Sequence, residues 1–580
     1  MFAVGRRNVT YVLLMVAGLL ALSSLGCGAG DSTALHINVY LNQSQRAQVC
    51  TDSNMFRIIA FDLPEVGRPS SSVSWKAEFS ADNVCNQGAI TLDPVPSKVA
   101  SVIVVESLNK ATASAQDNEM VLARGLAENI LWNEDREVNV EIQMGKVGNF
   151  SLLTKGDATQ RVVLDKGAMG LTATTLQDHR VLIVGGKGRE QESDIWYENS
   201  YIYDPASMEV IPLPSGAVHR AYHTATLLSD GMVLLVGGEK RMGVGRGSNT
   251  DVVLFNPDTM SFTTVATLNQ GRAWHTASHT YNTAGNELVV IAGGQDYDAS
   301  GNPTAPLTSI EVYNHTTHTV IQAAALNVGR TDFAATVLNN GNVMFHGGIK
   351  AYVNSVPVTT ASVEILDVNT SSIVVYHNEY DTGDTYKNIS RSGHKLIHLE
   401  AVVGVYTERI AIVGGSSRPD AGTSRPDAGT SPYYYTDVVM LDTTGAKTGC
   451  TLAFPSDVEA NRTWFSLNEY RVDSKTVYLM AGGQWEQGIN QTGVIMAFNA
   501  EATEPFCEWD RTRVYGGSSE ARPTMIPMAV SRFGHASTYM QNGQILLVGG
   551  KPGSDDPTPT MELFIAPTSN NQGNYRAYEQ

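Results

Sequence analysis

Seven short apolar runs, each ending in a glycine doublet, recur between residue 160 and the end of the chain. The doublets are Gly185-Gly186, Gly237-Gly238, Gly293-Gly294, Gly347-Gly348, Gly414-Gly415, Gly482-Gly483 and Gly549-Gly550. Successive doublets are 52 to 68 residues apart, and the longest interval contains the heptad SRPDAGT written twice, at residues 417–430. Runs that are apolar at every position indicate strands buried on both faces. Because one such unit cannot bury both faces alone, this periodicity predicts a repeat architecture.

Each copy carries further signals around its doublet. Six copies have an Arg-x-x-aromatic motif before the doublet: Arg220 with His223, Arg272 with His275, Arg330 with Phe333, Arg391 with His394, Arg462 with Phe465, and Arg532 with His535. The first copy has only Lys166 in that register. After each doublet come a polar loop, a third strand that ends in a turn, and a short fourth strand such as residues 262–268. Four strands per repeat predict an all-β, seven-bladed propeller over residues 149–580.

A glycine doublet with Arg and His before it and Tyr after it resembles the kelch repeat. The resemblance covers about residues 150–580 and implies a β-propeller of the kelch type. The last copy offers three strand-like segments, near residues 535–541, 545–548 and 561–565, and then only a polar tail. We therefore expect the segment 150–164, which precedes the first copy, to supply the missing strand and close the ring.

The first 26 residues have the pattern of an export signal. Arg6 and Arg7 precede an apolar stretch at residues 11–22, which is too short to span a bilayer. The sequence Ser-Leu-Gly-Cys that ends at Cys27 resembles a bacterial lipobox. We expect residues 1–26 to be removed, Cys27 to be lipidated, and residues 27–30 to form a short linker at the bacterial outer membrane or cell surface. An ordinary signal peptide with a free Cys27 is the alternative.

Residues 31–148 contain no glycine doublet but show seven strand-like runs separated by polar turns. This pattern resembles an immunoglobulin-like module and predicts a small β-sandwich, which would serve as a spacer or a binding module. Beyond Cys27 the chain has Cys50, Cys85, Cys450 and Cys507, an even number that favours two disulfides in an exported protein. Proximity favours Cys50 with Cys85 and Cys450 with Cys507. The alternative for Cys450 and Cys507 is that they stay unpaired, because equivalent positions on neighbouring blades can lie farther apart than the roughly 7 Å a disulfide spans.

Charge and loop composition point to a binding role. A net charge of -18 with no basic patch argues against nucleic acid as a partner and leaves the lipid anchor as the expected membrane contact. The loops after the doublets share a face with the connections between blades, where propellers bind partners. Exposed aromatic side chains anchor such contacts, whether with a protein or a glycan, unless they fold down onto neighbouring loops. The candidates are Trp196, Tyr197, Tyr297, Tyr352, Tyr433, Tyr434, Tyr435 and Trp485.

The sequence supplies no catalytic set, and we expect no cofactor or metal. The four motif histidines recur once per blade, which favours structural hydrogen bonding. Residues 296–301 resemble the start of an EF-hand loop, but Leu307 stands where a bidentate carboxylate is needed, so a turn is expected. Two enzymatic alternatives remain: a copper radical oxidase resembling galactose oxidase, for which no well-placed spare cysteine is found, and a propeller-type sialic acid mutarotase.

The duplicated heptad lies outside the repeat pattern, so deleting residues 416–436 is expected to leave the ring folded. Thermal unfolding of the deletion variant should remain cooperative. A broad, non-cooperative transition would show that this loop is part of the fold.

Overall fold

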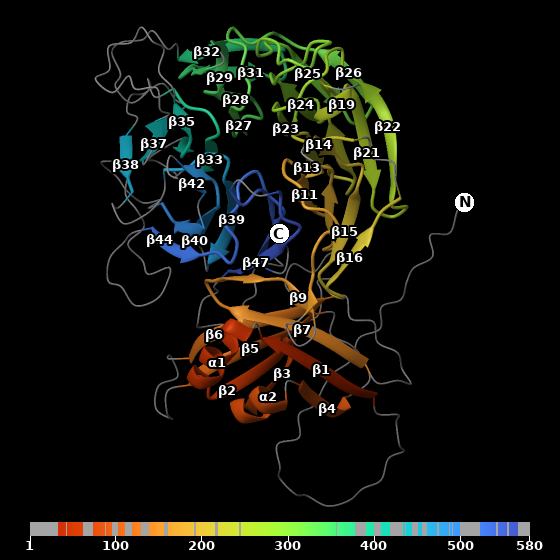
Figure 1. Cartoon of the computed structure of the whole chain (residues 1–580), viewed down its shortest axis with the longest axis vertical. Helices are drawn as coiled ribbons and strands as arrows, with labels where there is room; N and C mark the ends of the chain where they lie inside the picture. The colour runs from red at the N-terminus through yellow and green to blue at the C-terminus, as the bar shows by residue number, and fades with distance from the viewer. Residues whose placement is uncertain are drawn as a thin grey trace, which may run out of the picture.

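The computed structural model divides into an N-terminal unit and a ring of sheets (Figure 1). It describes residues 33–41, 43–61, 73–87, 89–95, 102–110, 119–128, 138–155, 160–190, 193–214, 219–242, 245–354, 356–377, 390–399, 408–417, 433–434, 437–442, 450–454, 461–472, 475–485, 488–489, 491–498, 523–540, 543–553 and 556–566. The expected signal segment, Cys27, Tyr435 and Cys507 lie outside these residues.

The N-terminal unit is one seven-stranded sheet with two helices. Its strands are β1 (Thr33–Leu41), β2 (Met55–Phe61), β3 (Val73–Ser80), β4 (Ala89–Val95), β5 (Val102–Lys110), β6 (Glu119–Glu128) and β7 (Val138–Lys146). They lie in the order β3-β2-β5-β6-β7-β1-β4, and only β1 and β7 run parallel. Helix α1 (Gln43–Asp52) follows β1, and helix α2 (Ala81–Gln87) follows β3. All seven predicted strands are therefore present.

The prediction of a β-sandwich over residues 31–148 is wrong. The described strands belong to a single sheet, and the two helices contribute to its core, where Val49 and Val84 pack with Ile58 and Val105. A second sheet is not needed because the helices already bury the apolar face.

The predicted disulfide is confirmed: Cys50 of α1 is bonded to Cys85 of α2, with 5.9 Å between their Cα atoms. Cys450 begins β38, and its pairing with Cys507 stays a prediction.

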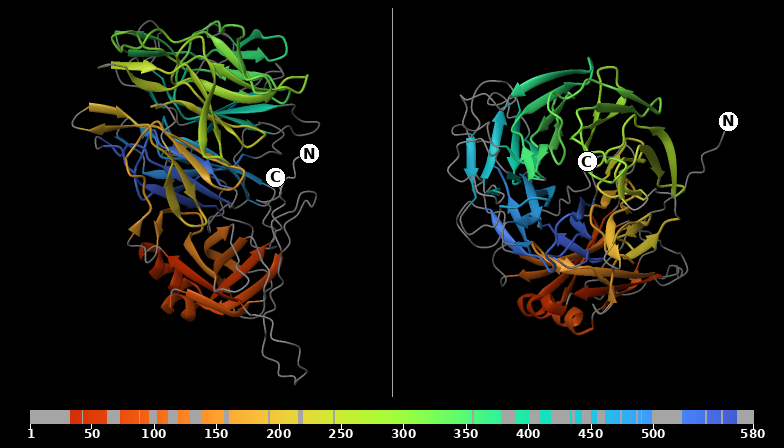
Figure 2. Two further views of the ribbon diagram at one scale, coloured as in Figure 1. Left: turned by 90° about the vertical axis from the view of Figure 1, so that its right-hand side faces the viewer. Right: turned by 45° about the horizontal axis from the view of Figure 1, so that its top comes forward.

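Seven four-stranded antiparallel sheets follow, numbered here sheet 1 to sheet 7 in chain order. Their strands are, for sheet 1, β11 (Thr172–Thr175), β12 (Val181–Val184), β15 (Ser200–Asp204) and β16 (Glu209–Pro212); for sheet 2, β17 (Thr224–Leu227), β18 (Val233–Val236), β21 (Asp251–Asn256) and β22 (Ser261–Thr267); for sheet 3, β23 (Thr276–Tyr281), β24 (Glu287–Ala292), β25 (Ile310–Asn314) and β26 (Thr319–Gln322); for sheet 4, β27 (Ala334–Val337), β28 (Val343–His346), β31 (Val363–Asp367) and β32 (Ser372–His377); for sheet 5, β33 (Lys395–Leu399), β34 (Arg409–Val413), β37 (Asp437–Asp442) and β38 (Cys450–Ala453); for sheet 6, β39 (Ser466–Val472), β40 (Lys475–Ala481), β43 (Thr492–Met496) and β44 (Thr524–Pro527); and for sheet 7, β45 (Ala536–Tyr539), β46 (Gln544–Val548), β47 (Met561–Ile565) and β8 (Phe150–Leu152). The sheets stand around a common axis (Figure 2).

Strand β8 closes the ring as the sequence predicts. It comes before sheet 1 in the chain but pairs with β47, so that Phe150 lies opposite Phe564. The N-terminal unit leads directly into this seam, because the Gly148 amide donates to the Ile565 carbonyl at 2.8 Å.

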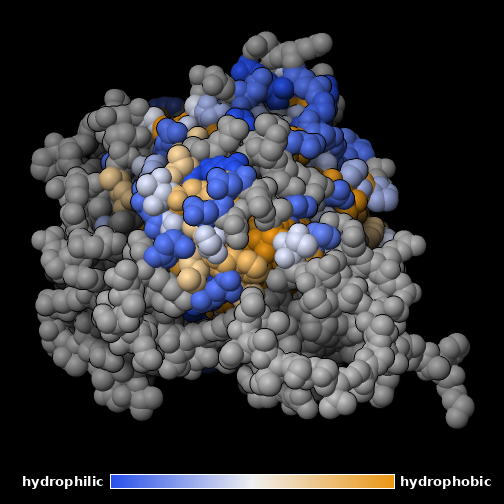
Figure 3. All heavy atoms as spheres, turned by 90° about the horizontal axis from the view of Figure 1, so that it is seen from below, coloured by the Kyte–Doolittle hydropathy of each residue, from blue (hydrophilic) through white to orange (hydrophobic). Residues whose placement is uncertain are grey.

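Seen from below, the described surface of the molecule mixes hydrophilic and hydrophobic residues (Figure 3).

Short hairpins extend the loops on one face of the ring, which we call the loop face. They are β13 (Lys187–Glu190) with β14 (Ser193–Trp196), β19 (Glu239–Met242) with β20 (Gly245–Ser248), β29 (Ile349–Val353) with β30 (Val356–Thr359), β35 (Ser416–Ser417) with β36 (Tyr433–Tyr434), and β41 (Gln484–Trp485) with β42 (Gly488–Ile489). One further hairpin, β9 (Thr154–Lys155) with β10 (Gln160–Arg161), follows the seam. Ser416 also exchanges two backbone hydrogen bonds with Ser392, so a deletion confined to residues 418–432 keeps these bonds as well as β35 and β36.

The glycine doublets join neighbouring sheets. All fourteen glycines have a positive φ, which costs glycine little. The amide of each second glycine donates to a carbonyl of the next sheet at 2.8 to 2.9 Å, and the acceptor is the motif arginine in six of the seven joints. In the seventh joint Gly550 donates to Ala168. The assignment of Lys166 to the arginine register is therefore wrong, because Ala168 occupies that place and Lys166 is exposed beside Glu190.

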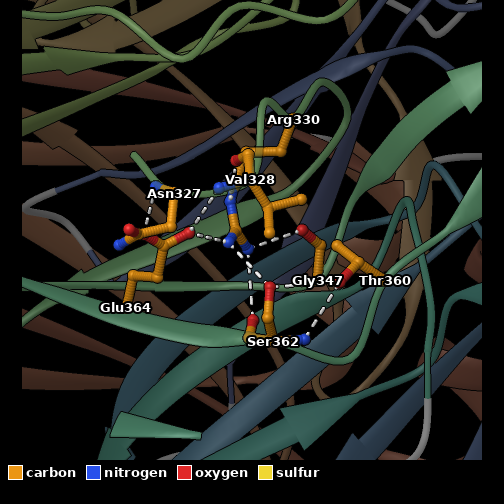
Figure 4. A network of polar contacts seen from close by, with 7 residues as sticks. All are labelled: Asn327, Val328, Arg330, Gly347, Thr360, Ser362 and Glu364. Atoms are coloured by element: carbon orange, nitrogen blue, oxygen red, sulfur yellow. Dashed lines mark hydrogen bonds and ion pairs between the residues drawn. The ribbon is translucent and has the colours of Figure 1, made fainter. Parts of the chain in front are cut away.

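The six motif arginines are fully buried beside the doublets. Each donates from one guanidinium nitrogen to the carbonyl of the first glycine in its own sheet, at 2.7 to 3.4 Å. In sheet 4, Arg330 also pairs with Glu364 at 2.5 Å, and Glu364 accepts the amides of Asn327 and Val328 (Figure 4). Glu311 and Glu562 hold the same place in sheets 3 and 7, whereas sheets 2, 5 and 6 have valine there: Val253, Val439 and Val494.

Replacing Glu364 by alanine is expected to lower the free energy of unfolding by about 3 to 5 kcal/mol, because Arg330 would remain buried without its counterion. Urea unfolding of the purified variant measures the change. Asp258→Ala, which removes an exposed carboxylate in the turn between β21 and β22, should change the same quantity by less than about 0.5 kcal/mol. Equal effects of the two variants would contradict this account of the buried pair.

Candidate functional site

The connection that enters each sheet contains one residue in a left-handed backbone conformation. These entry residues stand two positions after the motif arginine, or after Ala168 in sheet 1, and their φ angles lie between 52° and 69°. They are Gly170, Tyr222, Trp274, Asp332, Gly393, Trp464 and Gly534. Four of them carry side chains, although this conformation disfavours residues with a Cβ, and bulky ones such as Tyr222, Trp274 and Trp464 more than Asp332. Such strain persists only where the surrounding structure enforces it, and it gathers at functional sites.

The seven entry residues form a closed ring of backbone hydrogen bonds. The amide of each donates to the carbonyl of the entry residue in the preceding sheet, and Gly170 of sheet 1 donates to Gly534 of sheet 7. The seven donor–acceptor distances run from 2.7 to 3.3 Å. This entry ring encircles the axis on the loop face. It therefore brings side chains that are far apart in the sequence to the centre of that face.

Three aromatic entry residues form a platform with Phe533. Tyr222 stacks on Trp274 with 3.6 Å between ring centroids, and Trp274 lies 6.2 Å from Trp464. Trp464 in turn stacks on Phe533 at 5.9 Å. Trp464 is 37% exposed, while Phe533 is buried. We call these four residues the aromatic platform.

A buried carboxylate, Glu239, holds one side of the platform. It accepts hydrogen bonds from the indole of Trp274 at 3.1 Å and from the hydroxyl of Tyr297 at 2.5 Å, and it lies 3.2 Å from the Lys187 amine. Burial raises the pKa of Glu239, but the Lys187 charge and these two hydrogen bonds outweigh it and lower the pKa below its ordinary value. Glu239 is therefore ionised at neutral pH. Burial and the Glu239 charge raise the pKa of Tyr297, so its hydroxyl keeps its proton.

Asp332, the only acidic entry residue, lies beside the other side of the platform. Its carboxylate accepts a hydrogen bond from the Trp464 indole at 3.1 Å. Burial raises the pKa of Asp332 to about 6, against the opposing effects of the Trp464 hydrogen bond, the Lys395 charge and the Ser392 hydroxyl. Its charge therefore changes in a mildly acidic range.

Two of the predicted binding aromatics lie at this site, and two do not. The Tyr297 hydroxyl reaches Glu239, and Tyr352, on hairpin β29–β30, donates to Gln295 at 3.2 Å. Trp196 and Tyr197 are buried, and their assignment as exposed anchors is wrong: Tyr197 packs in the apolar core of sheets 1 and 7, and the Lys187 amine lies 5.8 Å from the centre of the Trp196 ring. The side chains of Tyr433, Tyr434 and Trp485 lie outside the described part of the chain.

The sequence prediction missed Tyr222, Trp274, Asp332 and Trp464. All four stand between the arginine and the aromatic of the Arg-x-x-aromatic motif, at a position treated as variable. A signal was present, because Gly393 and Gly534 occupy this position in two other copies. A position that alternates between glycine and bulky residues indicates a required positive φ with free choice of side chain.

The motif histidines have the structural role that the sequence predicts. His223, His275 and His535 each bond through Nε2 to a Thr or Ser hydroxyl of the preceding sheet, at 2.9 to 3.0 Å, and His394 bonds to His346 at 2.9 Å. Burial, reinforced by the neighbouring arginines, lowers the pKa of His275 and His535 to about 3. These imidazoles are neutral and tie sheets together.

Residues 296–301 form a turn. The Asp298 carboxylate accepts the amides of Ser300 and Asn302, both at 2.8 to 2.9 Å, so its oxygens face protein donors. In the described ranges, no three His, Cys, Asp or Glu side chains gather as a metal site would require. Nor does any helix of the described segments have the length and apolar character needed to cross a membrane.

Comparison with known proteins adds little. No protein-family model matches the chain, and no curated protein matches it. A solved structure titled "Structure of YjhT" aligns with a TM-score of 0.38 and 14% sequence identity, over 58% of this chain and 96% of the other. A match this distant says nothing about function.

Replacing Asp332 by asparagine is expected to stabilise the protein increasingly as the pH rises. Because the folded-state pKa, about 6, lies above the ordinary value of 3.8, the native protein loses stability as the pH rises through this window. The full loss is at most about 3 kcal/mol, and the Asn variant avoids it. Urea unfolding of both proteins between about pH 4 and pH 7 measures the difference. Asp258→Asn, at an exposed turn, is the control, and a pH-independent difference for Asp332→Asn would contradict the assignment.

Proposed function

We propose that the ring of seven sheets is a kelch-type β-propeller, in an exported protein anchored through Cys27, and that its loop face binds a protein or a glycan. The seven sheets with an internal Arg and glycine-doublet system support the kelch part of this proposal. The signal-like first 26 residues and the lipobox-like sequence before Cys27 support the anchor. The role is non-enzymatic, and the partner meets the face built from the hairpins and the entry ring.

The observation that carries the proposal is the concentration of exposed apolar side chains at the tips of two hairpins on this face. On hairpin β29–β30, Tyr352, Val353 and Val356 are 40%, 55% and 41% exposed, and Met242 on hairpin β19–β20 is 56% exposed. Both hairpins contact the loop of sheet 3 between them: Tyr352 bonds to Gln295, and Gly245 lies against Gly301. Grouped exposed apolar side chains of this kind mark interaction surfaces.

Ion pairs join two neighbouring hairpins of the loop face, β13–β14 and β19–β20. Lys187 neutralises Glu239, and Arg246 lies 3.6 Å from Asp194. Glu239 in turn holds Trp274 and Tyr297 by hydrogen bonds. Aromatic side chains that are held in place before binding lose little conformational freedom when a partner binds, which favours affinity.

The test compares two sets of substitutions in the chain from Cys27 onward, produced without the lipid. Tyr352→Ser, Val353→Ser and Val356→Ser together remove the apolar tip of hairpin β29–β30. Ile321→Ser and Val374→Ser remove side chains of matching exposure, 55% and 56%, from outer strands. Binding is measured on arrays of glycans and of extracellular protein domains.

The parent protein and the outer-strand control should bind the same array members, and the hairpin variant should bind them at least about tenfold more weakly, a loss of about 1.4 kcal/mol. Equal binding by the hairpin variant, or no array member bound by the parent protein, would contradict the proposal.

A further inference from the structure

We infer that the aromatic platform and Asp332 bind the ring of an uncharged sugar, with the apolar face of the sugar on Trp464 and a sugar hydroxyl donated to the Asp332 carboxylate. This inference rests on the proposed binding role of the loop face and names the ligand class for its centre.

Trp464 offers a flat apolar surface that is held in place. Its indole nitrogen donates to Asp332, Phe533 stacks on it, and Trp274 lies against it. The side chain nevertheless remains 37% exposed at the centre of a face. Large rigid aromatics provide contact area with little loss of entropy, and they combine an apolar body with a polar edge. The C–H face of a pyranose has matching flat, apolar character.

Asp332 has acceptor capacity left over. An ionised carboxylate offers about four lone-pair positions. The Trp464 indole and the Ser392 hydroxyl occupy two of them. The backbone of Asp332 is fixed within the entry ring, so the carboxylate stands beside the Trp464 edge in a set orientation. Hydrogen bonds from hydroxyl donors to a charged acceptor are among the stronger ones, which suits a polyhydroxyl ligand.

The charges around the platform favour a neutral ligand. Glu239 is paired with Lys187, Arg246 with Asp194, and Asp332 lies in the field of Lys395. A carboxylate group on the ligand would therefore lose hydration without gaining an unpaired cation, and an ammonium group beside Asp332 would meet the Lys395 charge; both are costly. A neutral sugar places only hydroxyl groups there. The closed entry ring beneath the platform means that such a ligand approaches from the loop face.

The experiment titrates the chain from Cys27 onward with free saccharides, following tryptophan emission and the heat of binding. The neutral probes are maltose, cellobiose, lactose, xylobiose and N,N'-diacetylchitobiose, and the charged probes are galacturonate and glucosamine. Trp464→Ala, Trp464→Phe and Asp332→Asn test the platform. Tyr281→Ala, which removes an aromatic of 47% exposure at the far end of the inner strand β23, is the control.

At least one neutral saccharide should bind saturably, and more tightly than either charged probe. Trp464→Ala and Asp332→Asn should each raise its Kd by about tenfold or more, Trp464→Phe by less, and Tyr281→Ala not at all. The inference is overturned if no neutral saccharide saturates, if a charged probe binds more tightly, or if Trp464→Ala binds like the parent. Continued array binding that depends on hairpin β29–β30, without any saccharide binding, would refute the sugar inference and leave the proposed function standing.

Discussion

The architecture of the ring depends on one backbone hydrogen bond, repeated seven times. The amide of the second glycine in each doublet donates to a carbonyl of the next sheet, at 2.8 to 2.9 Å. This close approach excludes a side chain on the first glycine, because a Cβ on Gly185 would lie 2.3 Å from the Arg220 carbonyl oxygen. This hydrogen bond fixes the backbone of the motif arginine, whose side chain contacts the glycine doublet of its own sheet. It also brings the entry residue, two positions after the arginine, to the axis of the ring.

The buried arginines show that the repeat tolerates chemical variation around a fixed geometry. Arg272, Arg330 and Arg532 each have a glutamate on the third strand of their sheet. Arg220 faces valine at that position, and burial lowers its pKa to about 10, with Asp251 partly compensating. The hydrogen bond to the first glycine is common to all six.

Much of the fold could be predicted because it repeats. The doublets, the arginines and the strand that closes sheet 7 follow from the periodic pattern, and the alternation in residues 31–148 identified all seven strands of the N-terminal sheet. Its two helices were not predicted, because α1 is polar and α2 has only seven residues. The aromatic platform was missed because its members lie at the two positions inside the Arg-x-x-aromatic motif, where residue type varies between copies: Tyr222, Trp274 and Trp464 at the second position and Phe533 at the first. Trp196 and Tyr197 were misplaced because the exposure of a loop aromatic depends on which residues surround it in the fold, which local sequence does not specify.

The seam at β8 is the part of the ring that lies closest in the chain to the N-terminal unit. Three residues of β8 pair with β47, whereas the other sheets are continuous in the chain. Strand β7 of the N-terminal sheet runs into this seam through a short turn at Gly148. A pull on the N-terminal sheet therefore reaches β8 along the backbone before it reaches any other strand of the ring. We therefore expect tension on the N-terminal unit to load the pairing of β8 with β47 before any other pairing in the ring.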